Sequence, residues 1–178
     1  MRIGWHMIRC GTWETGEEIR ITYPKKQRNF YEKKDRRCIY DQFERQVGIN
    51  KGNFVEMVAT KYFQGQGYNV ESYYYLVRNR NKREHMPGFT KTSHIFGKAK
   101  VRLLIAEADR AFHSIGKKIA SGDPDLFVYN EYTGDRFFVE VKENDQITDN
   151  QKILFPLVQK FLCPVFIARV IEEVIVIG

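Results

Sequence analysis

The sequence predicts an α/β fold in which helices flank a mixed β-sheet. Apolar residues recur with helical spacing in three segments, and short strand-like apolar runs lie between those segments. The chain has 178 residues and 43% hydrophobic content, which suffices to bury a core without disulfides or structural metals. We therefore expect one principal domain over 46–178, preceded by an N-terminal extension over 1–45.

The first predicted elements follow from periodicity and from glycine. The extension contains one candidate strand, at 19–23. In 53–64, apolar side chains cover about half of a helical wheel, which indicates a helix with one buried face. A glycine-containing turn follows, and an apolar run over 68–77 reads as a strand.

A basic loop containing Pro87 and Gly88 comes next, because a Pro-Gly pair is typical of a turn. The segment 98–114 then predicts a second helix. Its apolar residues in helical register are Val101, Leu104, Ile105, Ala108 and Phe112.

The next two strands form a predicted hairpin. The apolar runs 126–129 and 137–141 read as strands, and 130–135, with its Thr-Gly pair, reads as the turn. Antiparallel partners have position numbers of nearly constant sum, so Asp125 is expected opposite Glu140.

A chemical site follows from this hairpin. Side chains alternate along a strand, so Glu140 and Lys142 share one face, and we expect Lys142 exposed in a cleft. Two carboxylates are hard ligands suited to Mg²⁺ or Mn²⁺, and a nearby ammonium can orient or activate water. The other interpretation is a solvated hairpin. The opposing Pro124-Asp125 pair favours a phosphodiester-hydrolysing site.

A third helix follows the hairpin. Thr148 and Gln151 form a T-x-x-Q capping box at its start, and helical spacing also points Gln151 inward. Both roles of Gln151 are compatible. Two apolar strands, at 165–170 and 174–177, complete an αβαββαββ order.

These motifs resemble the PD-(D/E)xK nucleases and, more narrowly, the virus-type replication–repair nuclease (VRR-NUC) family. The close resemblance covers about 30 residues, and a looser one extends over 50–167. The matching residues are Gly122-Asp123-Pro124-Asp125-Leu126, Glu140-Val141-Lys142, Asp145, Thr148 and Asn150-Gln151.

The resemblance implies a restriction-endonuclease-like core, divalent-metal-dependent cleavage of DNA, and often a homodimer. It implies Asp125, Glu140 and the backbone carbonyl of Val141 as metal ligands, and Lys142 as the catalytic lysine. An acid on the first core helix usually completes such a site, and Glu56 is the candidate. Glu56 lies on the margin of the helix's apolar arc, where a metal ligand and a solvated boundary residue are both reasonable.

The net charge of +7 is concentrated in two segments. The segment 25–37 has a net charge of +5 and 78–91 a net charge of +4, each with interleaved aromatic residues. Such segments suit phosphate contact with base stacking, although solvated loops have similar composition. The candidate DNA-binding residues are Arg78, Arg80, Lys82, Arg83, Lys91, Lys25, Lys26 and Arg28.

Several other classes of protein are not supported. The three cysteines, Cys10, Cys38 and Cys163, are widely spaced, and neither they nor the four histidines have metal-binding spacing. No apolar run approaches a membrane span, and the N-terminus lacks a signal-peptide pattern. We expect a cytoplasmic protein of bacterial, phage or archaeal context, or one made in host cytosol if viral.

The sequence thus predicts a Mg²⁺- or Mn²⁺-dependent DNA endonuclease acting in replication, repair or on mobile elements. Asp125, Glu140 and Glu56 would bind the metal, Lys142 would activate water, and Gln151 would orient Lys142, water or the phosphate. A Holliday-junction resolvase and a restriction-type enzyme are alternatives with the same chemistry. A non-catalytic DNA-binding or assembly module is the alternative from another class. The substrate could be branched or duplex DNA.

Overall fold

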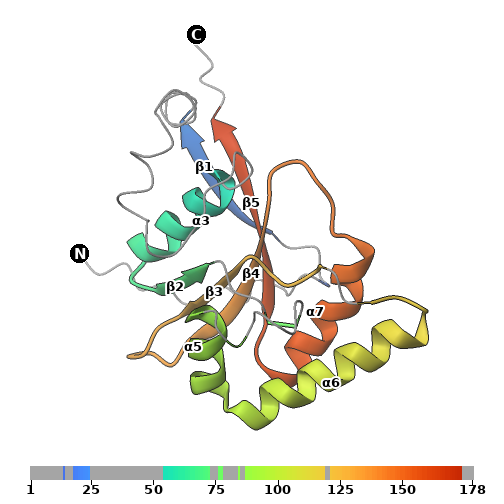
Figure 1. Cartoon of the computed structure of the whole chain (residues 1–178). Helices are drawn as coiled ribbons and strands as arrows, with labels where there is room; N and C mark the ends of the chain where they lie inside the picture. The colour runs from blue at the N-terminus through green and yellow to red at the C-terminus, as the bar shows by residue number, and fades with distance from the viewer. Residues whose placement is uncertain are drawn as a thin grey trace.

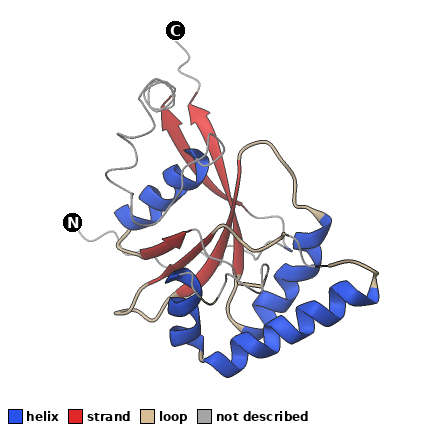
Figure 2. Ribbon diagram, viewed as in Figure 1, coloured by secondary structure: helices blue, strands red, loops and turns tan. Residues whose placement is uncertain are grey.

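A computed structural model describes residues 14, 18–24, 54–72, 76–77, 84, 87–118 and 121–173. Its elements are arranged around one sheet (Figures 1 and 2). In chain order they are β1 (Glu18–Pro24), α3 (Phe54–Gly65), β2 (Asn69–Ser72), α5 (Pro87–Phe96), α6 (Lys98–Ser114), β3 (Leu126–Tyr129), β4 (Arg136–Lys142), α7 (Asp149–Phe161) and β5 (Val165–Glu173).

The sheet is mixed, as predicted. In the described part of the chain it has five strands in the order β1-β5-β4-β3-β2. The pairs β1 with β5 and β4 with β5 are parallel, whereas β3 is antiparallel to both β2 and β4. Strand β4, which carries the candidate site residues, therefore lies at the centre.

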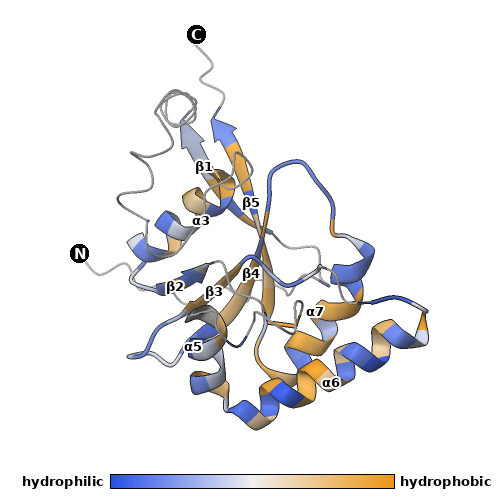
Figure 3. Ribbon diagram, in the orientation of Figure 1, coloured by the Kyte–Doolittle hydropathy of each residue, from blue (hydrophilic) through white to orange (hydrophobic). Residues whose placement is uncertain are grey.

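Helices cover both faces of the sheet (Figure 1). Helix α3 packs on one face, against side chains that include Val128, Val139 and Val170. Helices α6 and α7 cover the other face, where Phe127 and Phe138 are buried. The apolar colouring accordingly concentrates on β3, β4 and much of β5, and on parts of the helices (Figure 3). This arrangement confirms an α/β fold with helices flanking the sheet.

Helix α6 shows how well helical periodicity specifies an element. Its observed bounds, Lys98–Ser114, are the predicted ones, and its five buried residues are those expected from the spacing. The strand expected at 19–23 is also confirmed, within β1. Because β1 pairs along β5, the N-terminal extension contributes a strand to the same sheet.

Three predicted elements need correction. The loop expected around Pro87 is instead helix α5, because proline is well tolerated in a first helical turn and the helix packs apolar residues against the core. The strand expected over 68–77 is described as β2 over 69–72, 73–75 lie outside the described residues, and Leu76 and Val77 are not in a strand. Strand β5 continues unbroken from Val165 to Glu173, past the expected end at 170, and 174–177 lies outside the described residues.

None of the helices in the described part of the chain combines the length and the apolar character needed to cross a bilayer.

Candidate active site

The predicted hairpin has the predicted register. Leu126 pairs with Val139, so the next position outward sets Asp125 opposite Glu140. The ladder between β3 and β4 ends at this point. The Oδ2 atom of Asp125 then accepts a hydrogen bond of 2.8 Å from the N–H of Val141. This bond fixes the Asp125 carboxylate at the end of the central strand.

The segment before β3 is shaped by close packing against α7. Gly122 has φ +119°, and a Cβ added there would lie 3.2 Å from the Cβ of Asn150. The backbone conformation therefore favours glycine, and the close approach of α7 leaves little room for a side chain. Asp123 is buried, and its Oδ1 accepts a hydrogen bond of 2.9 Å from the N–H of Val77. In the Gly-Asp-Pro-Asp motif the first acid thus holds the backbone at Val77, and Asp125 is the acid that lies close enough to Glu140 to repel it.

Glu140 is the centre of a buried polar cluster. Its Oε1 accepts a hydrogen bond of 2.6 Å from the Nε2 of Gln151 and lies 2.9 Å from the Nζ of Lys142. The ammonium also binds the Oδ2 of Asp145 at 2.8 Å. Glu140 is 3% exposed and Lys142 is 4% exposed. The expectation that Lys142 is exposed in a cleft is therefore wrong, because the lysine is held by two carboxylates.

Gln151 forms the predicted capping box and also points inward, as its helical spacing indicated. The N–H of Gln151 donates to the Thr148 hydroxyl at 3.3 Å, and its own Oε1 accepts from the N–H of Thr148 at 2.9 Å. The capping box thus uses the amide oxygen and leaves the amide nitrogen to bind Glu140. The start of α7 is in this way tied directly to the strand that carries the acid.

Burial governs the electrostatics of this cluster. Desolvation, and then repulsion from Asp125, raise the pKa of Glu140 to about 8, against the opposing effects of Lys142 and Gln151. Burial opposes the charge on Lys142, but Asp145 and Glu140 together raise the pKa of the ammonium above its usual value. Lys142 in turn lowers the pKa of Asp145, although partial burial opposes this. The acid pair is strained in the ionised form, and a cation would relieve the strain.

The site fits a divalent cation. The Oε2 of Glu140 is buried and has no hydrogen-bond partner among the residues that the structure describes. A buried carboxylate oxygen without a donor is costly, and coordination to a hard cation would satisfy it. Asp125 supplies a second carboxylate beside it. The donor set is therefore that of a Mg²⁺ or Mn²⁺ site.

Glu56 comes from a different part of the fold. It lies in the first turn of α3, the helix on the sheet face opposite Glu140 and Lys142. Within the described ranges no three acidic, histidine or cysteine side chains gather as a metal cluster. The structure therefore brings together Asp125 and Glu140, while the metal-binding role of Glu56 stays a prediction.

Of the predicted DNA-binding residues, only Lys91 is described. Its Nζ lies 2.9 Å from Glu131 and 4.9 Å from the centre of the Tyr129 ring. Tyr129 ends β3, whereas Asp125 precedes its start, so Lys91 lies toward the far end of that strand. The remaining candidates lie outside the described residues: Arg78, Arg80, Lys82, Arg83, Lys25, Lys26 and Arg28.

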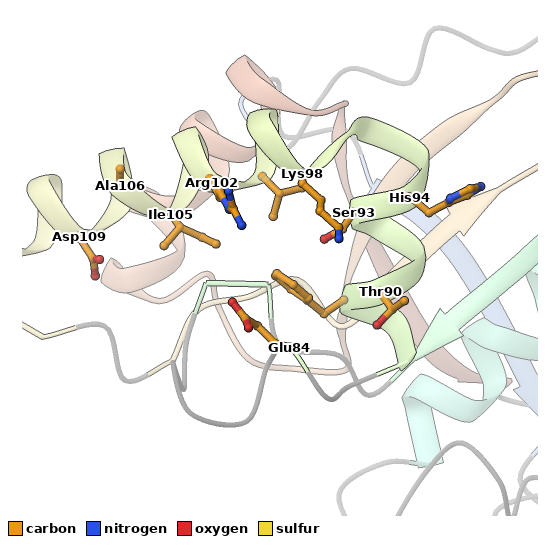
Figure 4. Close-up of a pocket in the computed structure, with 11 residues that line it drawn as sticks. Glu84, Thr90, Ser93, His94, Lys98, Arg102, Ile105, Ala106 and Asp109 are labelled. Carbon is orange, nitrogen blue, oxygen red and sulfur yellow. The ribbon is translucent and has the colours of Figure 1, made fainter.

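A pocket of about 620 Å³ lies apart from this cluster, between α5 and α6 (Figure 4). Phe89 and Ile105 give it an apolar side, while Lys98, Arg102 and Glu84 carry charge around it. None of the acid–lysine residues lines it. The candidate chemistry is therefore located at the end of β4 and not in this pocket.

The residues that hold the turn after β4 were not predicted as site residues, although Asp145 is among those that match the family pattern. Asp145 follows Lys142 by three positions, a spacing that could have suggested the ion pair. Arg169 binds Glu18 across 151 positions and also donates to the carbonyl oxygens of Glu143 and Asp145. No local sequence pattern predicts a contact between residues so far apart in the chain.

An α/β domain with an opposed acid pair and a lysine at the end of its central strand has the architecture of the PD-(D/E)xK nucleases. The model of the VRR-NUC domain matches residues 75–172. The chain therefore belongs to the VRR-NUC family of this nuclease superfamily, whose members act on DNA and generally use divalent metals. Neither the curated proteins nor the solved structures include a significant match to the chain.

Proposed function

We propose that this protein is a Mg²⁺- or Mn²⁺-dependent DNA endonuclease. The observation that carries the proposal is the buried Glu140 carboxylate, which has one oxygen bound by Gln151 and Lys142 and the other without a partner among the described residues. This arrangement supports a ligand at the open oxygen, with Lys142 held beside it. Membership of a nuclease family supports the same reaction class.

The residues of the cluster fall into metal ligands and groups that position or stabilise the reacting atoms. Asp125, the Oε2 of Glu140 and the Val141 carbonyl would hold the ion, with Glu56 as a further candidate. The ion would supply Lewis acidity toward the scissile phosphate. Lys142 would orient the attacking water or stabilise charge on the phosphate, and Gln151 would fix the Glu140 carboxylate. Asp145 would keep the ammonium in place.

Substrate shape and assembly are finer parts of the proposal. We expect selectivity for DNA structure, in a replication, repair or mobile-element setting, and DNA contact by the basic segment over 78–83. We also expect a two-fold homodimer, because short members of this family are often homodimers and because the sequence over 174–177 is apolar and uncharged. Sedimentation at micromolar concentration should then give about twice the 21.1 kDa chain mass.

The test is cleavage of a substrate panel with Mn²⁺ and with EDTA. The panel contains duplex, flap, four-way junction and single-stranded DNA, and each is incubated with wild-type protein and with Asp125→Asn. We expect Mn²⁺-dependent cleavage by the wild type only. Cleavage by Asp125→Asn at the wild-type rate would contradict the site, and binding without any cleavage would favour the DNA-binding module.

A further inference from the structure

We propose that Arg169, held by Glu18 of β1, is a positioning residue that fixes the turn after β4 and thereby the ammonium of Lys142. The proposal rests on the proposed function, since it concerns the lysine of that site. It gives the N-terminal strand, which precedes the segment matched by the family model, a part in building the active site.

The Arg169 guanidinium makes four hydrogen bonds in two directions. Toward β1, Nε and Nη2 donate to the two carboxylate oxygens of Glu18 at 3.1 and 2.6 Å. Toward the turn, Nη1 donates to the carbonyl oxygens of Glu143 and Asp145 at 3.2 and 3.0 Å. A planar guanidinium can satisfy both directions at once, and a lysine ammonium lacks that geometry.

The turn that Arg169 binds is the one that holds the lysine. Asp145 binds the Nζ of Lys142 at 2.8 Å, yet its side chain is 66% exposed. A carboxylate this exposed is not held in place by the packing of neighbouring side chains. Its position therefore depends on the backbone of the turn. Two of the three carbonyls from Glu143 to Asp145 are fixed by Arg169, so this arginine acts on Lys142 through Asp145.

Charge adds a second constraint. Arg169 is the register partner of Lys142 across β5 and β4, so the two cations lie side by side on one face of the sheet. The Glu18 carboxylate offsets the guanidinium, and the hydrogen bonds from Arg169 hold the pKa of Glu18 below its usual value. Without Glu18, the guanidinium would compete with Lys142 for Asp145.

Strand β1 also reaches the turn from the other face of the sheet. Tyr23 is 1% exposed, and its hydroxyl donates a hydrogen bond of 3.3 Å to the Glu143 carboxylate. Glu143 is thus bound through its side chain by β1 and through its carbonyl by Arg169. Figure 1 shows β1 alongside β5, with which it pairs in parallel.

The simpler explanation is that the Glu18–Arg169 pair only joins two strands. A matched control exists, because the Thr22 hydroxyl binds the Glu173 carboxylate at 3.0 Å between the same strands without touching the turn. We therefore compare Arg169→Lys and Glu18→Gln with Thr22→Val. The measurements are melting temperature, DNA affinity, single-turnover cleavage at saturating DNA, and amide hydrogen exchange over 143–147 in metal-free protein.

We expect Arg169→Lys to lower the single-turnover rate by about tenfold to a hundredfold, the usual effect of a displaced catalytic group, with DNA affinity changed less than about twofold. Exchange over 143–147 should become faster. Glu18→Gln should also lower the cleavage rate and speed the exchange, but by less than Arg169→Lys does. Thr22→Val should change neither the cleavage rate nor the exchange over 143–147, even if its melting temperature differs from that of the wild type.

Unchanged exchange over 143–147 in both Arg169→Lys and Glu18→Gln would overturn the proposal. Equal rate losses in Arg169→Lys and Thr22→Val would overturn it as well, because strand joining alone would then explain the effect. If the wild type cleaves no DNA, the proposed nuclease function fails, and the exchange comparison still decides whether Arg169 positions the turn. If Arg169→Lys does not fold, Glu18→Gln decides by the same measurements.

Discussion

At the scale of single residues, the buried lysine is the feature that most changes the chemistry expected from the sequence. An exposed Lys142 would be a solvated cation whose side chain is not held in one orientation. The observed Lys142 is held between Glu140 and Asp145 at 2.9 and 2.8 Å. The ammonium is therefore already oriented in the fold itself, as the electrostatic role proposed for it in catalysis requires.

The first prediction concerns this lysine. Lys142→Met should lower single-turnover cleavage by at least about a hundredfold, within the usual range for removal of an acid–base or charge-stabilising group. The variant should fold at neutral pH, because Glu140, whose pKa is raised to about 8, is already largely protonated there and leaves no unpaired buried charge when the lysine is removed. Single-turnover assays with saturating DNA and Mn²⁺ are the measurement, and a wild-type rate would exclude Lys142 from the reaction.

A second prediction follows from the pKa of Glu140. Because the folded-state pKa is raised to about 8 from the ordinary value of 4.5, the folded protein holds a proton that the unfolded chain has released. The contribution of Glu140 to the stability of the metal-free protein should therefore fall as pH rises from about 4.5 to about 8. Glu140→Gln removes this titration, so the variant should gain stability relative to wild type across that range.

The gain should be on the order of a few kcal/mol, since each pKa unit corresponds to about 1.4 kcal/mol. Urea unfolding in EDTA at pH 5 and at pH 8 measures it, and the pH 5 value serves as the internal reference. A difference between the two proteins that stays constant with pH would mean that Glu140 is not held protonated in the metal-free fold.

At the scale of secondary structure, the sequence was most informative where local signals agreed. The hairpin register, the capping box and α6 were predicted correctly because turn chemistry, capping residues and apolar spacing each pointed to one structure. Helix α5 was missed because the Pro-Gly pair outweighed the weaker apolar pattern that follows it. The Arg169 contacts depend on strand order, which local pattern does not determine.

Gly122 provides the prediction at this scale. Gly122→Ala should destabilise the fold by about 1–3 kcal/mol, because alanine is strained at positive φ and its Cβ would press on Asn150 of α7. Gly134→Ala is the matched control, since Gly134 also has positive φ (78°) but its added Cβ would meet nothing within 4 Å. Chemical unfolding should show a larger loss of stability for Gly122→Ala. Equal losses would mean that the approach of α7 is not close enough to matter.

At the scale of the whole molecule, charge and chemistry lie in different segments. The acid–lysine cluster ends the central strand, whereas two strongly basic segments account for the positive net charge of +7. Lys91, the one described candidate from these segments, is paired with Glu131 over the Tyr129 ring. We therefore expect DNA affinity to depend on residues that take no part in cleavage.

The prediction is that replacing Arg78, Arg80, Lys82 and Arg83 together with alanine weakens binding without abolishing cleavage at saturating DNA. The slope of log K against log salt should decrease by up to about 0.9 for each phosphate of duplex DNA that the variant no longer binds. Salt titration of binding, paired with single-turnover cleavage, measures both effects. An unchanged slope would mean that these residues are only solvated, and failure to cleave at saturation would give them a role in the transition state.

The central claim is that the acid pair at the end of β4 is a divalent-metal site, and thermal unfolding with increasing Mn²⁺ tests it most directly. A ligand raises the melting temperature only of the state that binds it, so wild type should be stabilised. Asp149→Asn alters an exposed acid outside the cluster and should keep that rise. Asp125→Asn should lose the rise while remaining as stable as wild type in EDTA. A full Mn²⁺-induced rise in Asp125→Asn would contradict the account.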